Sequence, residues 1–320
     1  MKILSGIRSS GILHLGNYLG AIKNWVELQE KADKAIYMVA DYHAITTPYD
    51  PKKFKNQVLD VALDYLAAGV DPKKSLLIRQ SQIPQHTELA WIFNTITPVS
   101  WLNRLPTYQE QIKNSPNHMG LLDYPVLMAA DILIYKANVV PVGDDQLAHI
   151  DVTNEIVKKF NHMFGETFEP VKPYLAEGAR IMSLKNPNNK MSKTGDEGIA
   201  LNDSAEAIRE KIKRATTDSG NEIKFDREKK PAISNLLDIY HLLSGKKIEK
   251  IEDDYEGKSY SQFKEDLAEV IVDYLKPFQQ KRAEIEENME VELILTESEK
   301  NAIIIAEKTL KTVKTSMGLI

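Results

Sequence analysis

The first half of the chain alternates short apolar runs with longer amphipathic stretches, and this alternation restricts the folds that are open to it. The apolar runs span residues 2–4, 35–39, 75–78 and 138–142. The amphipathic stretches have helical length and span residues 16–31, 51–68, 86–96, 124–137 and 146–160. Strands separated by helices of this length are typical of βαβ units, so the pattern predicts a parallel sheet covered by helices.

The pattern changes near residue 184. Residues 183–198 are rich in Asn, Pro, Gly, Ser and Lys, which is typical of a loop. Beyond this loop the spacing of apolar residues is helical, over residues 204–215, 234–243, 261–287 and 297–317. The chain has 320 residues, enough for two domains. We therefore predict an α/β fold, with a Rossmann-like, parallel-sheet nucleotide-binding domain over residues 1–185 and an all-α helical domain over residues 186–320.

Composition and charge exclude several kinds of site. The chain has no cysteine, which excludes disulfides, thiolate nucleophiles and cysteine-ligated metal centres. Its net charge of −5 is not that of a wholesale basic nucleic-acid binder, although residues 209–214 hold four bases and one acid. No apolar run approaches the length of a membrane span, and the N-terminus has no signal-peptide pattern. A cytoplasmic chain without a membrane partner is therefore expected.

A glycine-bearing segment, residues 6–17, leaves the first predicted strand and enters a helix. Open parallel sheets bind ligands at the carboxyl ends of their strands, and free N–H groups at a helix start can face an anion. Gly16 would let a nucleotide approach the backbone, and His14 and Asn17 share a helix face from which both could bind a phosphate. The alternative interpretation is a helix cap with a surface histidine.

A second segment, residues 190–194, reads Lys-Met-Ser-Lys-Thr within the predicted loop. The ammonium groups of Lys190 and Lys193 suit a leaving pyrophosphate, whose charge develops in the transition state. A charged surface loop is the alternative.

The helical stretch at 124–137 carries a carboxylate among apolar neighbours. Tyr124, Met128 and Asp131 share one face of this predicted helix. A carboxylate is costly there unless it is hydrogen-bonded. Asp131 is therefore either paired with an internal Arg or Lys, or it accepts a hydrogen bond from a ligand.

Taken together, these segments resemble the signatures of class I aminoacyl-tRNA synthetases. Residues 14–17, His-Leu-Gly-Asn, are similar to the His-x-Gly-His signature, and residues 190–194 are similar to the Lys-Met-Ser-Lys-Ser signature. Further strings at residues 123–133, 140–146 and 178–184 are similar to the bacterial tryptophanyl-tRNA synthetases. The resemblance covers essentially the whole chain.

The resemblance implies a two-step ligation, in which ATP activates L-tryptophan to tryptophanyl-adenylate and the tryptophanyl group passes to the 3′-terminal adenosine of tRNA(Trp). It implies Mg²⁺ held through the phosphates of ATP, with no metal site made by the protein. It also implies a homodimer, and a helical domain that binds the anticodon, with candidates around residues 209–214. A tyrosine-specific enzyme, a non-catalytic paralogue and another nucleotidylyltransferase are the alternatives.

The resemblance also assigns roles residue by residue. Catalytic roles fall on His14, Asn17, Lys190 and Lys193. ATP contacts fall on Arg8, Ser9, Ser10, Gly16, Asn17, Gly143, Asp144, Asp145, Ile181, Lys190, Met191, Ser192, Lys193 and Thr194. Tryptophan contacts fall on Asp131, which reads the indole N–H, and on Tyr124, Met128, His43, Gln146, Val140 and Val142. For His43 a structural role is the alternative. The remaining histidines, His86, His118, His149, His162 and His241, are expected only at surface or packing positions.

Two positions depart from the usual bacterial pattern. Residues 8–10 read Arg-Ser-Ser where relatives have Gln-Pro-Ser, and Gln109 stands where many relatives have a lysine that reaches the ATP phosphates. One cation is gained and one is lost within a single site. We therefore predict that Arg8 or Lys113 supplies the missing positive charge.

Overall fold

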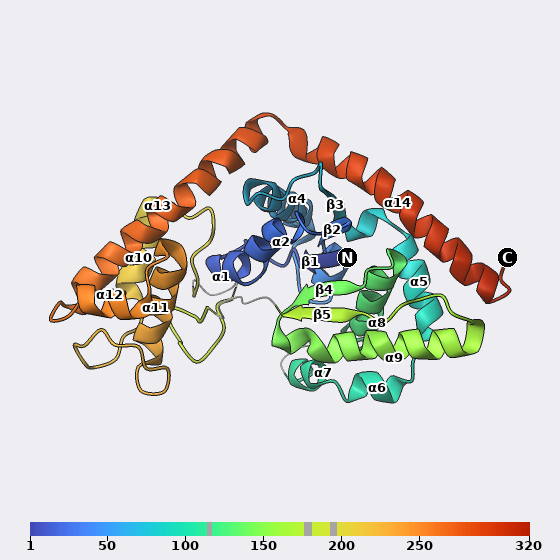
Figure 1. The fold of residues 1–320 in the computed structure, drawn as a ribbon, viewed down its shortest axis with the longest axis horizontal. Coiled ribbons are helices and arrows are strands. Elements are labelled where there is room, and N and C mark those ends of the chain that lie inside the picture. The colour runs from blue at the N-terminus through green and yellow to red at the C-terminus, as the bar shows by residue number, and fades with distance from the viewer. Residues whose placement is uncertain (114–116, 176–180, 193–196) are drawn as a thin grey trace.

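A computed structural model describes residues 1–113, 117–175, 181–192 and 197–320 (Figure 1). Five parallel strands form its sheet: β1 (Lys2–Ile7), β2 (Lys34–Val39), β3 (Ser75–Arg79), β4 (Val139–Val142) and β5 (Lys172–Leu175). Their order is β3-β2-β1-β4-β5. The four strands expected from the sequence and their parallel arrangement are confirmed, and β5 was not predicted.

The strand order reverses beside β1. The chain passes from β1 to β2 to β3 in one direction and then returns to place β4 on the other side of β1. At such a switch point the two flanking connections leave the sheet on opposite faces, and a crevice opens beyond the carboxyl ends of the strands. The fold therefore places the natural ligand position at the ends of β1 and β4.

Helices cover both faces of this sheet. One face packs against α2 (Lys23–Leu28) and α4 (Pro51–Ala67), with Trp25 and Tyr65 fully buried between them and the strands. The other face packs against α5 (Gln85–Asn94), α8 (Met119–Ile134) and α9 (Leu147–Phe164). The predicted helix at 51–68 is confirmed, and it ends before Gly69, whose φ of 106° suits glycine.

The segment after the first loop departs from a single regular helix. The predicted helix at 16–31 is observed as α1 (Leu15–Asn17), a π-helical segment (Tyr18–Ile22) and α2. π-Helical turns widen a helix locally and are frequent at functional sites. Here the wide turn directly follows the segment with which ATP contacts are predicted.

The second half of the chain is helical. Its helices are α10 (Ala205–Arg214), α11 (Pro231–Ser244), α12 (Ile248–Asp254), α13 (Tyr260–Glu287) and α14 (Glu290–Ser316). The first part of α13 packs against α10 and α11, and α13 then runs up to α4. In Figure 1 the two long helices α13 and α14 meet at an apex and diverge over the rest of the molecule. Among the described residues, no helix has both the length and the apolar character needed to cross a bilayer.

The last helix returns to the sheet. Ala302, Ala306, Leu310 and Val313 of α14 are buried with the residues of α5 and α8. Arg79, at the end of β3, forms a two-pronged pair with Glu299 at 2.7 and 2.8 Å. The predicted domain division after residue 185 stays a prediction, and this packing adds that α14 completes the core around the sheet.

Gly6 is the position in β1 where a side chain is least tolerable. Its partner in β2 is Met38, and a Cβ atom at Gly6 would lie 2.6 Å from the Met38 carbonyl oxygen. We expect Gly6→Ala to lower the free energy of unfolding by about 1–3 kcal/mol, because the two strands must separate to relieve the clash. Urea denaturation measures this change. Gly120→Ala in α8, where the nearest atom would be 3.4 Å away, is the control, and equal losses in both variants would contradict the expectation.

Candidate active site

Four strand ends supply the candidate site. Arg8 follows β1, His43 lies in the short helix α3 (Asp41–Ala44) after β2, and Gln80 follows β3. Residues 143–146 follow β4. The structure thus places these residues at the carboxyl ends of the parallel strands, where open sheets bind ligands, and their functional roles stay predictions.

A buried carboxylate, Asp131 on α8, lies at the centre of this group. It is 1% exposed. His43 Nε2 lies 2.8 Å from Oδ2, and His86 Nδ1 lies 2.6 Å from Oδ1. Gln80 donates from Nε2 to both oxygens, at 2.9 and 3.0 Å. The internal partners of Asp131 are therefore two histidines and an amide, where the alternative interpretation named an Arg or Lys.

These contacts keep Asp131 ionised. Burial alone raises the pKa of its carboxyl, but the hydrogen bonds and the electrostatic interactions of His43 and His86 outweigh burial and hold the pKa at about 2. A carboxylate has about four acceptor positions, and three donor atoms already make four contacts with it, so a further donor from a ligand would share one of its oxygens with them. That Asp131 reads an indole N–H stays a prediction.

His86 was expected at a surface or packing position, and the structure places it at a buried position where its ring is also hydrogen-bonded. His86 is fully buried, and its second nitrogen, Nε2, lies 2.7 Å from the Tyr135 hydroxyl. It therefore bridges Asp131 of α8 and Tyr135, which directly follows the last residue of that helix. The sequence gives little sign of this bridge, because His86 comes from another helix, α5.

A second polar group surrounds His149 on α9. Its Nε2 lies 3.0 Å from both the Tyr124 hydroxyl and the Thr107 hydroxyl, and its Nδ1 lies 2.8 Å from Gln146 Oε1. His149 is 1% exposed, and burial lowers its pKa to about 4. It is therefore a neutral imidazole at physiological pH. The sequence analysis expected a surface or packing position for His149; the position is buried, and its ring also contacts Tyr124 and Gln146, two of the residues predicted to bind tryptophan.

Apolar side chains flank these two polar groups. Val140 is buried with the residues of α8 and α9, and Val142 and Met128 are half-buried against the same cluster. The structure thus brings together the predicted tryptophan contacts of α8 and β4. The ring of His43 lies edge-on to Tyr124, with centroids 6.2 Å apart, and so links the two polar groups.

The loop after β1 presents three different environments. Arg8 is exposed. Burial raises the pKa of the Tyr124 hydroxyl, and the positive charge of Arg8 opposes part of this increase. Ser9 is fully buried, and its hydroxyl has no hydrogen-bond partner among the described residues. Ser10 is exposed. The structure therefore brings Arg8, but not the hydroxyl of Ser9, toward open solvent at the site.

His14 and Asn17 form a reciprocal cap at the start of α1. His14 Nδ1 accepts from the Asn17 backbone, at 3.3 Å, and Asn17 Oδ1 accepts from the His14 backbone, at 3.2 Å. This geometry matches the helix-cap alternative, except that His14 is buried. A Cβ at Gly16 would lie 3.1 Å from the His14 ring, so the glycine also makes room for that ring. Phosphate contacts of these residues stay predictions.

The two signature segments lie against one another. Leu15 donates its backbone N–H to Ile199 at 2.9 Å, and Leu201 donates to Leu13 at 3.0 Å. Met191 is buried in the same cluster as Leu13 and Leu15, and its backbone donates to Ile181 at 3.0 Å. The fold therefore joins segments that are far apart in the sequence, as the predicted shared site requires.

Lys190 reaches toward the loop that follows β4. Its Nζ lies 3.9 Å from Asp145 Oδ1, and Gln146 donates from Nε2 to Asp145 Oδ2 at 2.8 Å. Burial raises the pKa of Asp145, but these two neighbours outweigh it and lower the pKa overall. Gly143 and Asp144 are exposed beside it, and Ser192 is half-buried. Lys193 and Thr194 lie outside the described residues.

The two predicted replacement cations, Arg8 and Lys113, are both exposed. Gln109, in α7 (Pro106–Gln111), donates to the Asn103 carbonyl at 2.6 Å. Lys113 is exposed two residues after α7. Arg8 is the one whose charge the structure places beside a predicted tryptophan contact.

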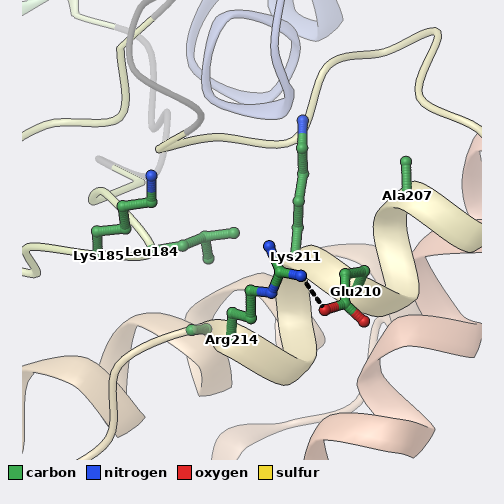
Figure 2. Close-up of a pocket in the computed structure, with 7 residues that line it drawn as sticks. Leu184, Lys185, Ala207, Glu210, Lys211 and Arg214 are labelled. Atoms are coloured by element: carbon green, nitrogen blue, oxygen red, sulfur yellow. Dashed lines mark ion pairs between the residues drawn. The ribbon is translucent and has the colours of Figure 1, made fainter.

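The basic run at residues 209–214 borders a cavity of about 310 Å³ beside α10, which lies across the molecule from α8 (Figures 1 and 2). Its lining residues are Leu184, Lys185, Ala207, Glu210, Lys211, Arg214 and Ala215. Arg214 pairs with Glu210 at 2.5 Å, as Figure 2 shows, and Lys211 pairs with Asp203 at 2.7 Å. Arg209 pairs with Glu269 of α13 at 2.6 Å. Much of the positive charge in this run is therefore balanced within the protein.

Gln80 is a further buried residue of this group that the sequence analysis did not name. It is fully buried, and besides contacting Asp131 its Oε1 accepts from the His43 backbone at 3.3 Å. Its position directly after a predicted parallel strand was the available signal. Polar side chains at such strand ends lie beside the ligand crevice.

Comparison with known proteins gives a consistent result. The family described as tRNA synthetases class I (W and Y) matches residues 1–276. The chain is 43% identical over 324 residues to the tryptophan–tRNA ligase of Caldanaerobacter subterraneus subsp. tengcongensis, an alignment that covers 100% of this chain and 98% of the relative.

Solved structures of similar proteins superpose over nearly the whole chain. Tryptophanyl-tRNA synthetase from Mycoplasma pneumoniae has a TM-score of 0.89 at 31% identity and covers 99% of this chain and 97% of its own. The Campylobacter jejuni enzyme, solved with ADP and tryptophan, has a TM-score of 0.86 at 34% identity and covers 99% and 100%.

Proposed function

Because the chain belongs to the class I tRNA synthetases of the W and Y group, we propose that it is a tryptophan–tRNA ligase. It activates L-tryptophan with ATP and transfers the tryptophanyl group to the 3′-terminal adenosine of tRNA(Trp). The observation that carries this conclusion is the 43% identity to a tryptophan–tRNA ligase along the whole chain. The buried, ionised Asp131 agrees with it, because an indole offers one N–H donor and no acceptor.

The same carboxylate favours tryptophan over tyrosine. A phenol both donates and accepts, and a site built for it must satisfy both functions. In the group around Asp131, the donors of His43, His86 and Gln80 are already directed at the carboxylate. An indole N–H needs only to share one of these carboxylate oxygens, whereas a phenol oxygen would also need a donor of its own.

In the first step, a tryptophan carboxylate oxygen attacks the α-phosphorus of ATP, and the bond from that phosphorus to the bridging oxygen of pyrophosphate breaks. Positioning and charge stabilisation account for catalysis of this kind. We propose that Lys190, with Lys193, stabilises the charge on the departing pyrophosphate. Asp144 and Asp145 are suited to accept from the ribose hydroxyls, and Ile181 to contact adenine. Mg²⁺ would be held by the phosphate oxygens of ATP.

In the second step, a hydroxyl of the terminal adenosine attacks the carbonyl carbon of the adenylate. An ester forms, and AMP leaves with the electron pair of the broken mixed-anhydride bond. By similarity to class I enzymes the 2′-hydroxyl reacts first. We propose that the helical domain binds the anticodon through bases near residues 209–214 and through stacking. A homodimer is part of the same proposal, and it agrees with the 71% exposure of Trp91 on α5. The cytoplasmic location stays a prediction.

Amino-acid-dependent ATP–pyrophosphate exchange tests the proposed function. We expect exchange with tryptophan and at most a trace with tyrosine, because tyrosine leaves polar groups unpaired in the pocket. The measurement uses the full chain with Mg²⁺ and labelled pyrophosphate. Absence of exchange with either amino acid would favour the non-catalytic alternative, and exchange with tyrosine would overturn the proposed specificity.

The positive charge that is missing at Gln109, and that Arg8 or Lys113 is predicted to supply, gives a separate prediction. We expect either Arg8→Gln or Lys113→Ala to slow pyrophosphate release by about tenfold, because a charge-assisted phosphate contact is lost. Single-turnover measurement of pyrophosphate release tests each variant. Arg104→Gln, an arginine whose Nε donates to the Ser100 carbonyl on α6 (Val99–Asn103), serves as the matched control. If both variants release pyrophosphate at the wild-type rate, neither residue replaces the missing lysine.

A further inference from the structure

We propose that His149 is a positioning residue that fixes the Gln146 amide. Through this amide it connects the tryptophan pocket to Lys190 of the segment at residues 190–194. This inference rests on the proposed function. His149 lies outside the set of residues for which the sequence predicted a role. It contacts the site only through other side chains, those of Tyr124, Thr107 and Gln146.

The contacts of His149 determine which of its nitrogens carries the proton. Gln146 donates from Nε2 to the Asp145 carboxylate, so its other atom, Oε1, must be the carbonyl oxygen and an acceptor. His149 Nδ1, which lies 2.8 Å from that oxygen, therefore donates. A neutral ring that carries its proton on Nδ1 leaves Nε2 as an acceptor. Burial, which lowers the pKa of His149 to about 4, supports the neutral form.

The acceptor nitrogen in turn arranges two hydroxyl groups. Tyr124, Thr107 and His149 Nε2 are mutually 3.0 Å apart. One hydroxyl donates to Nε2, and the other donates to the first hydroxyl. The Tyr124 hydroxyl thus donates its proton to His149 or to Thr107. Its oxygen can still accept a hydrogen bond from a donor such as the tryptophan ammonium group. A protonated His149 would instead place a cation beside that group.

The donor nitrogen acts in the opposite direction, toward the phosphates. With Oε1 held by His149, Gln146 presents its amide nitrogen to Asp145, at 2.8 Å. Asp145 in turn lies 3.9 Å from Lys190 Nζ. Without His149 Nδ1 the amide can rotate and lose this orientation, so the carboxylate that faces Lys190 loses its fixed donor. The buried ring of His149 therefore orders both the tryptophan pocket and, through Gln146 and Asp145, the surroundings of Lys190.

Two substitutions separate the two nitrogens. In His149→Asn the side-chain amide nitrogen stands where Nδ1 stands, so the contact to Gln146 is kept and the acceptor for Tyr124 is lost. In His149→Gln the amide oxygen stands where Nε2 stands, so the acceptor is kept and the contact to Gln146 is lost. A merely structural histidine would not distinguish the two variants.

The experiment measures steady-state ATP–pyrophosphate exchange and, by calorimetry, tryptophan binding without ATP. We expect His149→Gln to raise the KM for ATP about tenfold and His149→Asn to leave it within about twofold of wild type, because one oriented hydrogen bond is lost or kept. His149→Asn should weaken tryptophan binding more than His149→Gln, because only His149→Asn removes the acceptor that orders the Tyr124 hydroxyl. Gln146→Ala should raise the KM for ATP like His149→Gln, and the double variant should add nothing further.

The outcomes are distinguishable. Equal effects of Asn and Gln on the KM for ATP, or an unchanged KM in His149→Gln, would overturn the inference while leaving the proposed function intact. If either histidine variant does not fold, additive effects of Gln146→Ala and Asp145→Ala on the KM for ATP would overturn it. If the wild-type chain shows no tryptophan-dependent exchange, the proposed function itself fails and the inference fails with it.

Discussion

Asp131→Ala is expected to lower the free energy of unfolding at neutral pH by about 3–5 kcal/mol, because it leaves buried donors without their acceptor. His86 and Gln80 are fully buried, and His43 is nearly so, and all three direct a nitrogen at this carboxylate. Tryptophan-dependent exchange should be lost in the same variant. Asp131→Asn should be nearly as damaging, because its amide nitrogen would face another donor.

Chemical denaturation with urea measures the effect on stability. Asp123→Asn on the same helix is the matched control, since Asp123 is only half-buried and has one partner, Asn94, at 2.9 Å. We expect it to cost less than about 1 kcal/mol. If the Asp131 variants were as stable as the control and still bound tryptophan, the central place of this carboxylate in both the fold and the site would be refuted.

The pH dependence of the same comparison has a defined sign. The carboxyl pKa is about 2 in the folded protein and about 3.9 in an unfolded chain. The stabilisation from ionised Asp131 is therefore fully present above about pH 5 and is lost progressively as the pH falls through the unfolded pKa of about 3.9 toward the folded pKa of about 2. The stability difference between wild type and Asp131→Asn should accordingly narrow as the pH is lowered from 5. A difference that widened would contradict the assignment of the charge to Asp131.

Lys190→Ala is expected to reduce the rate of adenylate formation by about 10²–10³-fold, because the charge of a leaving group would lose its stabilising ammonium. Tryptophan binding should change little, since Lys190 approaches the tryptophan pocket only through Asp145. Rapid-quench measurement of pyrophosphate release with saturating substrates isolates the chemical step.

Lys185→Ala is a suitable control for this experiment. Lys185 belongs to the same segment of chain but lines the cavity beside α10 (Figure 2). We expect its rate to stay within about twofold of wild type, because surface charges at a distance are screened by salt. A Lys190→Ala enzyme that formed adenylate at the wild-type rate, with only weaker ATP binding, would show that Lys190 binds the ground state and does not act in the transition state.

Long elements with regular periodicity could be predicted from the sequence. The strands β1 to β4 and the helix at 51–68 follow from apolar spacing, whereas β5 is exposed along its length and contains Pro173. Proline is tolerated in a strand at the edge of a sheet, but it weakens the sequence signal for one. The short helices α6, α7 and α12 were also missed, because five to seven residues are too few to display a period.

The residues of the candidate site also fall into those that the sequence could indicate and those that it could not. His14, Asp131, Gln146 and Lys190 could be found because they stand in contiguous strings that resemble a known family. His86 and His149 could not, because each acts through partners that come from other elements of the fold. A histidine in an amphipathic helix has the same pattern whether its ring packs against aliphatic side chains or bridges two polar ones. Only the three-dimensional arrangement distinguishes these cases.

The return of α14 to the sheet has a consequence for synthesis on the ribosome. β3 is an edge strand, and the backbone N–H of Arg79 is satisfied by Glu299, a residue 220 positions later. Open strand edges pair readily with other chains. While the chain emerges, β3 is complete long before its cover exists. Nearly the whole polypeptide must therefore leave the exit tunnel before the β3 edge is covered. During most of synthesis this edge is open to pairing with other chains, and a chaperone that binds the nascent N-terminal half would protect it.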